Sequence, residues 1–176
     1  MTQASTPAQG ELIAGRYRLD ALVGGTSDNG YSLWRGTDGL LSRDVSIELR
    51  VPGGISAQSM LSAASNAGRI AHANVIGVYD AVDEGDRAFV VREWVEGRTF
   101  TEVLVSEGPF DPYQAAGLAR TAADAIAAIH QAGMAHGHLS PDTVLINTEG
   151  ELTFTHLELS AGIAPDEDVV AIGGLL

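Results

Sequence analysis

The chain has 176 residues, no cysteine, and 23 acidic against ten basic residues, which gives a formal net charge of −13. Nucleic acid and anionic membrane surfaces are therefore excluded as expected direct ligands, because they carry charge of the same sign. The lack of cysteine excludes a disulfide framework and is consistent with a cytoplasmic location. No apolar run is long enough to predict a transmembrane helix.

The first half of the chain predicts a β-rich region that contains one helix. Residues 1–10 are typical of a flexible tail. An alanine-rich pattern predicts a helix at Ser56–Ile70, and Val95–Gly97 is the predicted hinge to the second half. Runs rich in β-branched and aromatic residues predict strands at Tyr17–Val23, Tyr31–Arg35, Val45–Val51, Val75–Val82 and Phe89–Trp94.

The second half predicts mainly helices. Asp111 and Pro112 are a favourable helix start, as N-cap and first-turn residue, and Gly133 is a favourable stop. The apolar stripe of Val169 and Ile172 predicts a last helix that contains Asp168. The other predicted elements are helices at Phe100–Ser106 and Pro112–Gln131, strands at Val144–Ile146 and Leu152–Thr155, and a turn at Asn147–Gly150.

Residues 136–146 read His-Gly-His-Leu-Ser-Pro-Asp-Thr-Val-Leu-Ile. This run resembles the catalytic loop of eukaryotic-like Ser/Thr protein kinases, His-Arg-Asp-Leu-Lys-Pro-x-Asn-Val-Leu-Leu. Further segments resemble the kinase domain in the same order, and those around the hinge and before the loop are most like actinobacterial kinases. They are Ala14–Gly24, Ser32–Gly36, Arg43–Val51, Ala71–Val82, Phe89–Phe100 and Leu118–Gly133.

The resemblance implies an α+β, protein-kinase-like fold of two lobes. Residues 11–95 would form the N-lobe, an antiparallel sheet with helix C, and residues 96–176 a partial, mainly helical C-lobe. Only nine residues separate Glu158 from Asp168, so the activation segment looks shortened. The chain would then stop inside helix F, which implies a truncated C-lobe completed by missing sequence or a partner.

The residues that carry kinase chemistry are replaced. Phosphoryl transfer needs a strand-three lysine on the phosphates, paired with a helix C glutamate, and these positions fall on Glu48 and, approximately, Ala63. In the catalytic loop, the aspartate falls on His138, the lysine on Ser140 and the metal-binding asparagine on Thr143. All ten basic residues are arginines, so no lysine elsewhere can substitute.

The metal-binding Asp-Phe-Gly motif of the family aligns with His156, Leu157 and Glu158, and imidazole is a poor ligand for magnesium. The segment Gly24–Gly30 lacks the glycine spacing of a phosphate-binding loop and is more typical of a β-turn. Ser46 replaces the alanine that lines the adenine pocket in the family, which is a mild change.

Four positions that hold the kinase frame together are retained. The resemblance implies packing roles for His136 and Leu145, and Leu157 can fill the place of the motif's phenylalanine. Asp168 matches the helix F aspartate, which holds the backbone of the catalytic loop in the family. A retained frame without its chemistry predicts a pseudokinase, that is, a domain that is not an enzyme and needs no cofactor or metal.

The resemblance to the kinase-homology domains of actinobacterial MviN proteins, which are MurJ-like membrane proteins of peptidoglycan precursor export, implies a regulatory scaffold. Such a domain would be cytoplasmic, tethered to the plasma membrane through the rest of a larger protein, and without membrane contact of its own. An upstream Ser/Thr kinase would phosphorylate it, and a forkhead-associated-domain protein would bind the phosphothreonine. The residues do not place that threonine: among the candidates, Thr2 and Thr6 are expected to be exposed and Thr121 lies in a predicted helix, and a site beyond Leu176 is the alternative.

Two alternatives remain open. The hinge residues Glu93–Val95 could still bind adenine through their backbone, which would give a nucleotide-binding domain without phosphotransfer. His138 and His156, with Glu48 or Glu158, could instead hold zinc, since two imidazoles and a carboxylate suit that metal. The competing interpretation is that these histidines have no ligand role.

Overall fold

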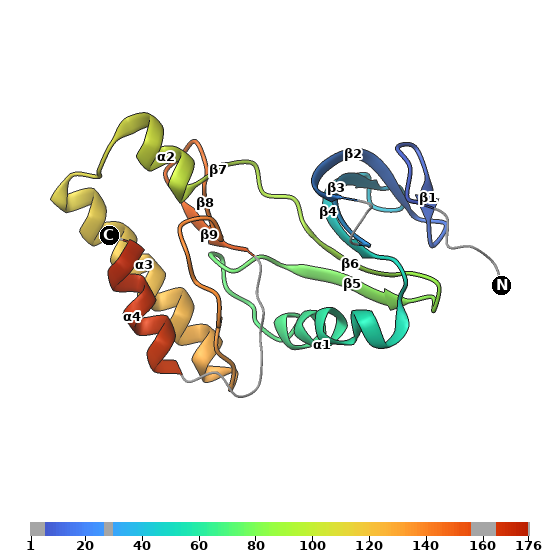
Figure 1. Cartoon of the computed structure of the whole chain (residues 1–176). Coiled ribbons are helices and arrows are strands. Elements are labelled where there is room, and N and C mark those ends of the chain that lie inside the picture. The colour runs from blue at the N-terminus through green and yellow to red at the C-terminus, as the bar shows by residue number, and fades with distance from the viewer. Residues whose placement is uncertain (1–5, 27–29, 156–164, 176) are drawn as a thin grey trace. The chain divides into compact units, whose positions relative to one another are not determined.

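The computed structural model describes residues 6–26, 30–155 and 165–175. The chain divides into two compact units, one of Met1–Ser65 with Val78–Trp94 and one of Asn66–Gly77 with Val95–Leu176. Figure 1 shows that strands dominate the first unit and helices the second. The predicted α+β class is therefore confirmed, and each unit is described by itself below.

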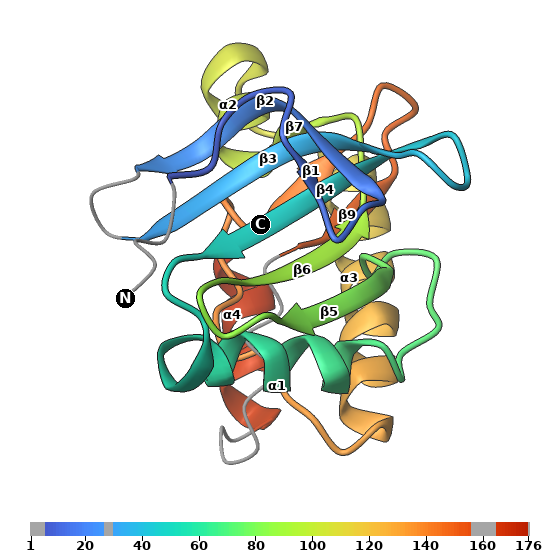
Figure 2. The same ribbon diagram turned by 90° about the vertical axis from the view of Figure 1, so that its right-hand side faces the viewer.

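The first unit contains a six-stranded antiparallel sheet in the order β1-β2-β3-β4-β6-β5, whose strands lie side by side in Figure 2. Shifts of register near Leu19 and Leu22 interrupt the pairing of β2 with β3, as bulges do, and so increase the local twist. The strands are β1 (Leu12–Ile13), β2 (Tyr17–Thr26), β3 (Tyr31–Asp38), β4 (Arg43–Arg50), β5 (Val78–Asp83) and β6 (Ala88–Glu93).

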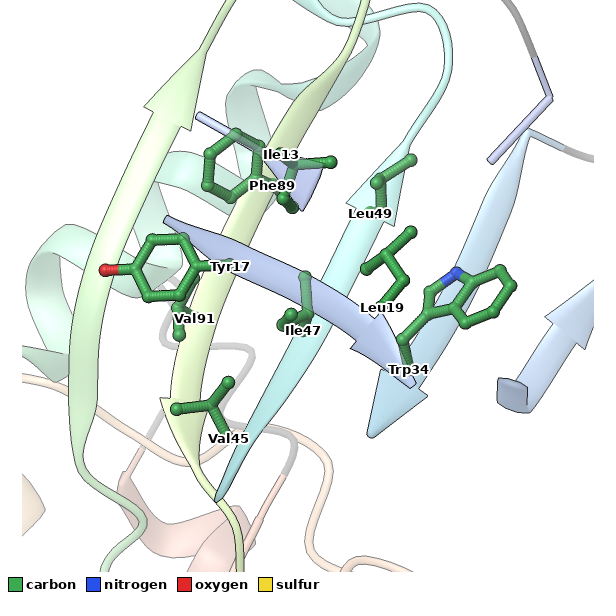
Figure 3. Close-up of a cluster of buried hydrophobic side chains, with 9 residues drawn as sticks. All are labelled: Ile13, Tyr17, Leu19, Trp34, Val45, Ile47, Leu49, Phe89 and Val91. Atoms are coloured by element: carbon green, nitrogen blue, oxygen red, sulfur yellow. The ribbon is translucent and has the colours of Figure 1, made fainter. Parts of the chain in front are cut away.

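The main core of this unit lies on one face of β4. Val45, Ile47 and Leu49 are fully buried and alternate with half-buried residues, which is the two-residue period of a strand. They pack with Ile13, Tyr17, Leu19, Trp34, Phe89 and Val91. Figure 3 shows these side chains gathered between the strand that carries Tyr17 and Leu19 and the strands that carry Ile47 and Phe89.

A smaller apolar cluster covers the other face, where Ala57, Met60 and Ala64 pack with Ala88 and Val90. The first three residues come from a 3₁₀ turn, Gly54–Ala57, and the helix α1 (Gln58–Ala67) that follows it. The helix is shorter than the predicted Ser56–Ile70. Its last turn is closed by bonds from the Arg69 and Ile70 N–H groups to carbonyls three residues back, which tighten and end the helix.

In the part of the chain that the structure describes, the second unit combines a three-stranded sheet with three helices. Helix α3 has the predicted bounds, because the Asp111 carboxylate accepts from the Tyr113 and Gln114 N–H groups at its start. None of the helices in the described ranges is long and apolar enough to cross a membrane. The elements are β7 (Arg98–Thr99), α2 (Phe100–Glu107), α3 (Pro112–Gln131), β8 (Val144–Ile146), β9 (Leu152–Phe154) and α4 (Pro165–Leu175).

The strand predicted at Val75–Val82 is wrong at its start, since β5 begins at Val78. Val75 instead forms an isolated parallel bridge with Phe154 in the second unit, beside a hydrogen bond from the Ile76 N–H to the Phe154 carbonyl. The β-rich run therefore serves two different pairings. The strands β1 and β7 were not predicted, because two residues are too few to show a period.

A buried carboxylate, Asp38, organises one end of the first sheet. Its oxygens accept two hydrogen bonds of 2.8 Å from the Arg16 guanidinium and two more from the backbone of Leu40 and Leu41. Arg43 approaches it to 3.4 Å. The hydrogen bonds from Arg16 hold the pKa of Asp38 well below its usual value.

Acid should therefore weaken this unit through Asp38. The carboxylate contributes its stabilisation in full above its unfolded pKa, about 3.9, and loses it as the pH falls through the lower folded pKa. We expect the urea midpoints of wild type and Asp38→Asn to differ most at pH 6 and to converge toward pH 2. Asp44→Asn, which changes an exposed ion pair, is the control. A constant difference between wild type and Asp38→Asn across this range would contradict the prediction.

Candidate functional site

Glu48, which the sequence resemblance aligns with the kinase lysine, lies in the middle of β4 on the face opposite the main core. Its neighbours in register are Leu33 on β3 and Val90 on β6, which are both apolar. The Glu48 side chain is only 14% exposed. A carboxylate so far removed from water requires a partner, because an unpaired buried charge is strongly unfavourable.

The partner of Glu48 is Arg92 on β6, whose Nη1 donates to the Glu48 Oε2. The register pairs Arg92 with Ser46, so the guanidinium reaches diagonally along the sheet to the glutamate two residues further on. The Arg92 side chain is 9% exposed. Sequence reasoning missed Arg92, although an arginine inside the apolar run that begins at Phe89 was a visible signal.

The same face carries a second arginine that does not join this pair. Arg50 pairs in register with Tyr31, and its guanidinium lies 5.3 Å from the centre of the Tyr31 ring. Burial raises the pKa of Tyr31, and the charge of Glu48 raises it further. This face of the sheet thus holds a buried ion pair among apolar residues such as Leu33 and Val90, with Arg50 and Tyr31 beside it.

Helix α1 contributes no charge to this face. Ala63, which the sequence resemblance aligns approximately with the helix C glutamate, is half-buried, and the whole of Gln58–Ala67 contains no acidic or basic residue. The helix is held by the apolar contacts of Met60 and Ala64. An ion pair between β4 and α1 is therefore impossible in this chain, whichever way the helix turns.

In the second unit, Asp168 on α4 connects three segments. Its Oδ2 accepts from the His136 N–H at 2.7 Å and lies 2.9 Å from the His130 Nε2, and its Oδ1 accepts from the Gly137 N–H at 3.0 Å. Burial raises the pKa of Asp168, but the hydrogen bonds from His130, Gly137 and His136 outweigh it and leave the pKa below its usual value. The carboxylate thereby fixes the start of the loop at residues 136–143.

Within that loop, the histidines differ in environment. His136 is fully buried, with its ring edge-on to Phe154 at 5.7 Å between centres. His138, which the sequence resemblance aligns with the catalytic aspartate, is exposed, and Ser140 is half-buried. Gly137 between the histidines adopts a left-handed backbone with φ of 75°, which turns the chain there.

Thr143, which the sequence resemblance aligns with the metal-binding asparagine, uses its side chain to close the loop. Its hydroxyl accepts from the Ser140 N–H at 3.0 Å and lies within donating distance of the carbonyls of His138 and Ser140, at 3.1 and 2.9 Å. Only 6% of Thr143 is exposed. The hydroxyl is therefore occupied by the loop's own backbone and is poorly placed to ligate a metal ion.

The remaining predicted positions are less informative. Leu145 is half-buried on β8, between Thr99 and Thr153 in register. His156, Leu157 and Glu158 lie outside the described residues. Within the ranges that the structure describes, no three His, Asp or Glu side chains come close enough together to hold a metal ion. The predicted positions thus gather in two places, one around Glu48 and one in the loop that Asp168 holds.

A family model of the protein kinase domain matches residues 54–172, which is more than half of the chain. The chain therefore belongs to the protein kinase domain family, and the predicted protein-kinase-like fold is confirmed. The sheet with helix α1 corresponds to the N-lobe of that fold, and the mainly helical second unit to part of its C-lobe.

Curated bacterial proteins of this family are similar to the chain over most of its length. The serine/threonine-protein kinase PknL of Mycobacterium tuberculosis is 28% identical over 172 residues, 93% of this chain and 42% of the relative. A probable serine/threonine-protein kinase PknB of Corynebacterium glutamicum is 31% identical over 147 residues, which cover 79% of this chain and 22% of the relative. The serine/threonine-protein kinase PrkC of Bacillus subtilis is 26% identical over 159 residues, which cover 88% of this chain and 24% of the relative. The chain thus spans less than half the length of these relatives.

Proposed function

We propose that this domain is a pseudokinase: a member of the protein kinase family that transfers no phosphate and acts as a regulatory docking domain. The observation that carries the proposal is the buried ion pair of Glu48 with Arg92. It puts an anion, already neutralised by its own partner, where the family uses a lysine to hold phosphates.

The loop of the second unit supports the same proposal. His138 stands where the family has the acceptor of the substrate's hydroxyl proton, and the Thr143 hydroxyl is engaged by the loop backbone. By contrast, the contacts of Asp168 to the backbone keep the loop in a fixed shape. A loop that is well held and chemically replaced suits recognition by another protein better than catalysis.

The direct test is a phosphotransfer assay with ATP, magnesium and a generic protein substrate. PknL of M. tuberculosis, which is named as a Ser/Thr kinase, serves as the positive control. We expect incorporation at background, at least about 10³-fold below the control, because positioning and charge neutralisation are both lost. Transfer above background that His138→Ala abolishes would overturn the proposal.

We further propose that the docking depends on phosphorylation. An upstream Ser/Thr kinase would phosphorylate the domain, and a forkhead-associated-domain protein would bind the phosphorylated form. This docking would act in the control of peptidoglycan synthesis. The support is the resemblance to the MviN kinase-homology domains. Among the candidate threonines, Thr6 is exposed, whereas the Thr121 hydroxyl donates to the Gly117 carbonyl within α3. Thr6 is therefore the better candidate of these two for phosphorylation.

Calorimetry with an isolated forkhead-associated domain tests this docking. We expect the full-length protein to bind only after treatment with an upstream Ser/Thr kinase, and mass spectrometry to locate the phosphate. Thr6→Ala is compared with Thr121→Ala as the matched variant. Equal binding of the phosphorylated and unphosphorylated proteins would refute the phosphorylation-dependent mode.

A further inference from the structure

The pair of Glu48 and Arg92 has a consequence for nucleotide binding, which is separate from phosphotransfer, since a domain without catalysis can still bind ATP. Kinases hold the nucleotide phosphates over the strand that carries their lysine. On this strand, the carboxylate of Glu48 and the guanidinium of Arg92 neutralise each other and are 14% and 9% exposed. The guanidinium next to Glu48, that of Arg92, is therefore already engaged in an ion pair and is not available to a phosphate.

We infer that Arg92 closes the nucleotide site from within, by holding Glu48 in a buried ion pair along the surface of β4 and β6. The register places the Arg92 backbone beside Ser46, while its guanidinium reaches Glu48. The side chain thus extends over the sheet surface between these two positions. A planar base requires an apolar lining there, and the ion pair offers charge instead.

Neither charge can be removed alone to open the site. Without Arg92, the Glu48 carboxylate would stay unpaired and would repel phosphate. Without Glu48, Arg92 would be left as an unpaired, nearly buried cation. The double variant Glu48→Lys/Arg92→Met removes the anion and the obstructing guanidinium together, and places a lysine on β4.

The experiment is calorimetry of the purified chain with ADP, without and with magnesium, for wild type, both single variants and the double variant. We expect no binding by wild type at about 1 mM ADP, and binding by the double variant at least about tenfold tighter, a gain of about 1.4 kcal/mol or more. Arg50→Met is the matched control, because it removes an arginine of the same face whose guanidinium lies over the Tyr31 ring, whereas Arg92 forms the ion pair with Glu48. It should remain without binding.

Two outcomes would overturn the inference. One is binding of ADP by wild type with a Kd below about 0.1 mM that Arg92→Met leaves unchanged. The other is a double variant that folds, by circular dichroism, and still does not bind. If the double variant does not fold, Glu48→Arg/Arg92→Glu takes its place, because it keeps an ion pair with the two charges exchanged. This variant is expected not to bind ADP. Binding of ADP to it would also refute the inference. Neither result depends on whether phosphate is transferred.

Discussion

Asp168→Ala is expected to lower the free energy of unfolding by about 3–5 kcal/mol, because the substitution leaves several buried hydrogen-bond donors without an acceptor at once. The carboxylate accepts from the backbone of His136 and Gly137 and contacts the ring of His130. Hydrogen bonds to an ionised acceptor are stronger than neutral ones, and the methyl group of alanine replaces none of them. Chemical denaturation followed by circular dichroism would measure the loss.

The controls for this prediction stand in the same helical turn. Asp166 and Glu167 are exposed acids at the start of α4, where a negative charge interacts favourably with the helix dipole, so their alanine variants should cost less than about 1 kcal/mol. Hydrogen exchange supplies a second readout: the amides of His136 and Gly137 should exchange faster in Asp168→Ala. If the three variants lose similar stability, the carboxylate does not hold the loop.

Breaking the pair of Glu48 and Arg92 should also have a large effect. Glu48→Met or Arg92→Met alone should cost about 3–5 kcal/mol, since each leaves one buried charge without its partner. The double variant Glu48→Met/Arg92→Met should lie within about 1–2 kcal/mol of wild type, or above it, because apolar side chains of similar volume often replace a buried pair without loss. A double-mutant cycle by urea denaturation measures this coupling.

The exposed pair of Arg98 and Glu107 is the matched control for the cycle. Its side chains are 52% and 58% exposed, and the same methionine substitutions there should cost less than about 1 kcal/mol. If the double variant at Glu48 and Arg92 loses the sum of the two single effects, the charges act independently and the ion pair is not what stabilises this face.

Local sequence signals predicted most helices and strands well, but they did not predict which segments far apart in the chain pair with each other. Helix α3 was predicted with both ends, because Asp111 and Pro112 specify its start within a few residues. The run at Val75–Val82 has uniform β-propensity, but its first residues pair with β9 and the rest with β6. Propensity reports that a segment is extended and does not identify its neighbour.

The candidate site shows the same difference between what local sequence signals predict and what depends on pairing across the chain. The motif predicted Glu48 as a site position, but the partner of Glu48 lies 44 residues further along the chain and depends on the register between β4 and β6. The self-closure of the loop through Thr143 could not be read from residue types either. A threonine in a loop can donate to solvent, to its own turn or to a ligand, and only the backbone geometry around Ser140 decides between them.

The ion pair on β4 lastly bears on how freely helix α1 can be displaced. Glu48 and Arg92 both belong to the sheet, so their ion pair can persist when the helix moves. A displacement of α1 would give up the apolar contacts of Ala57, Met60 and Ala64 with Ala88 and Val90. Because Gln58–Ala67 contains no charged residue, a protein that binds α1 can shift the helix without breaking an ion pair between helix and strand.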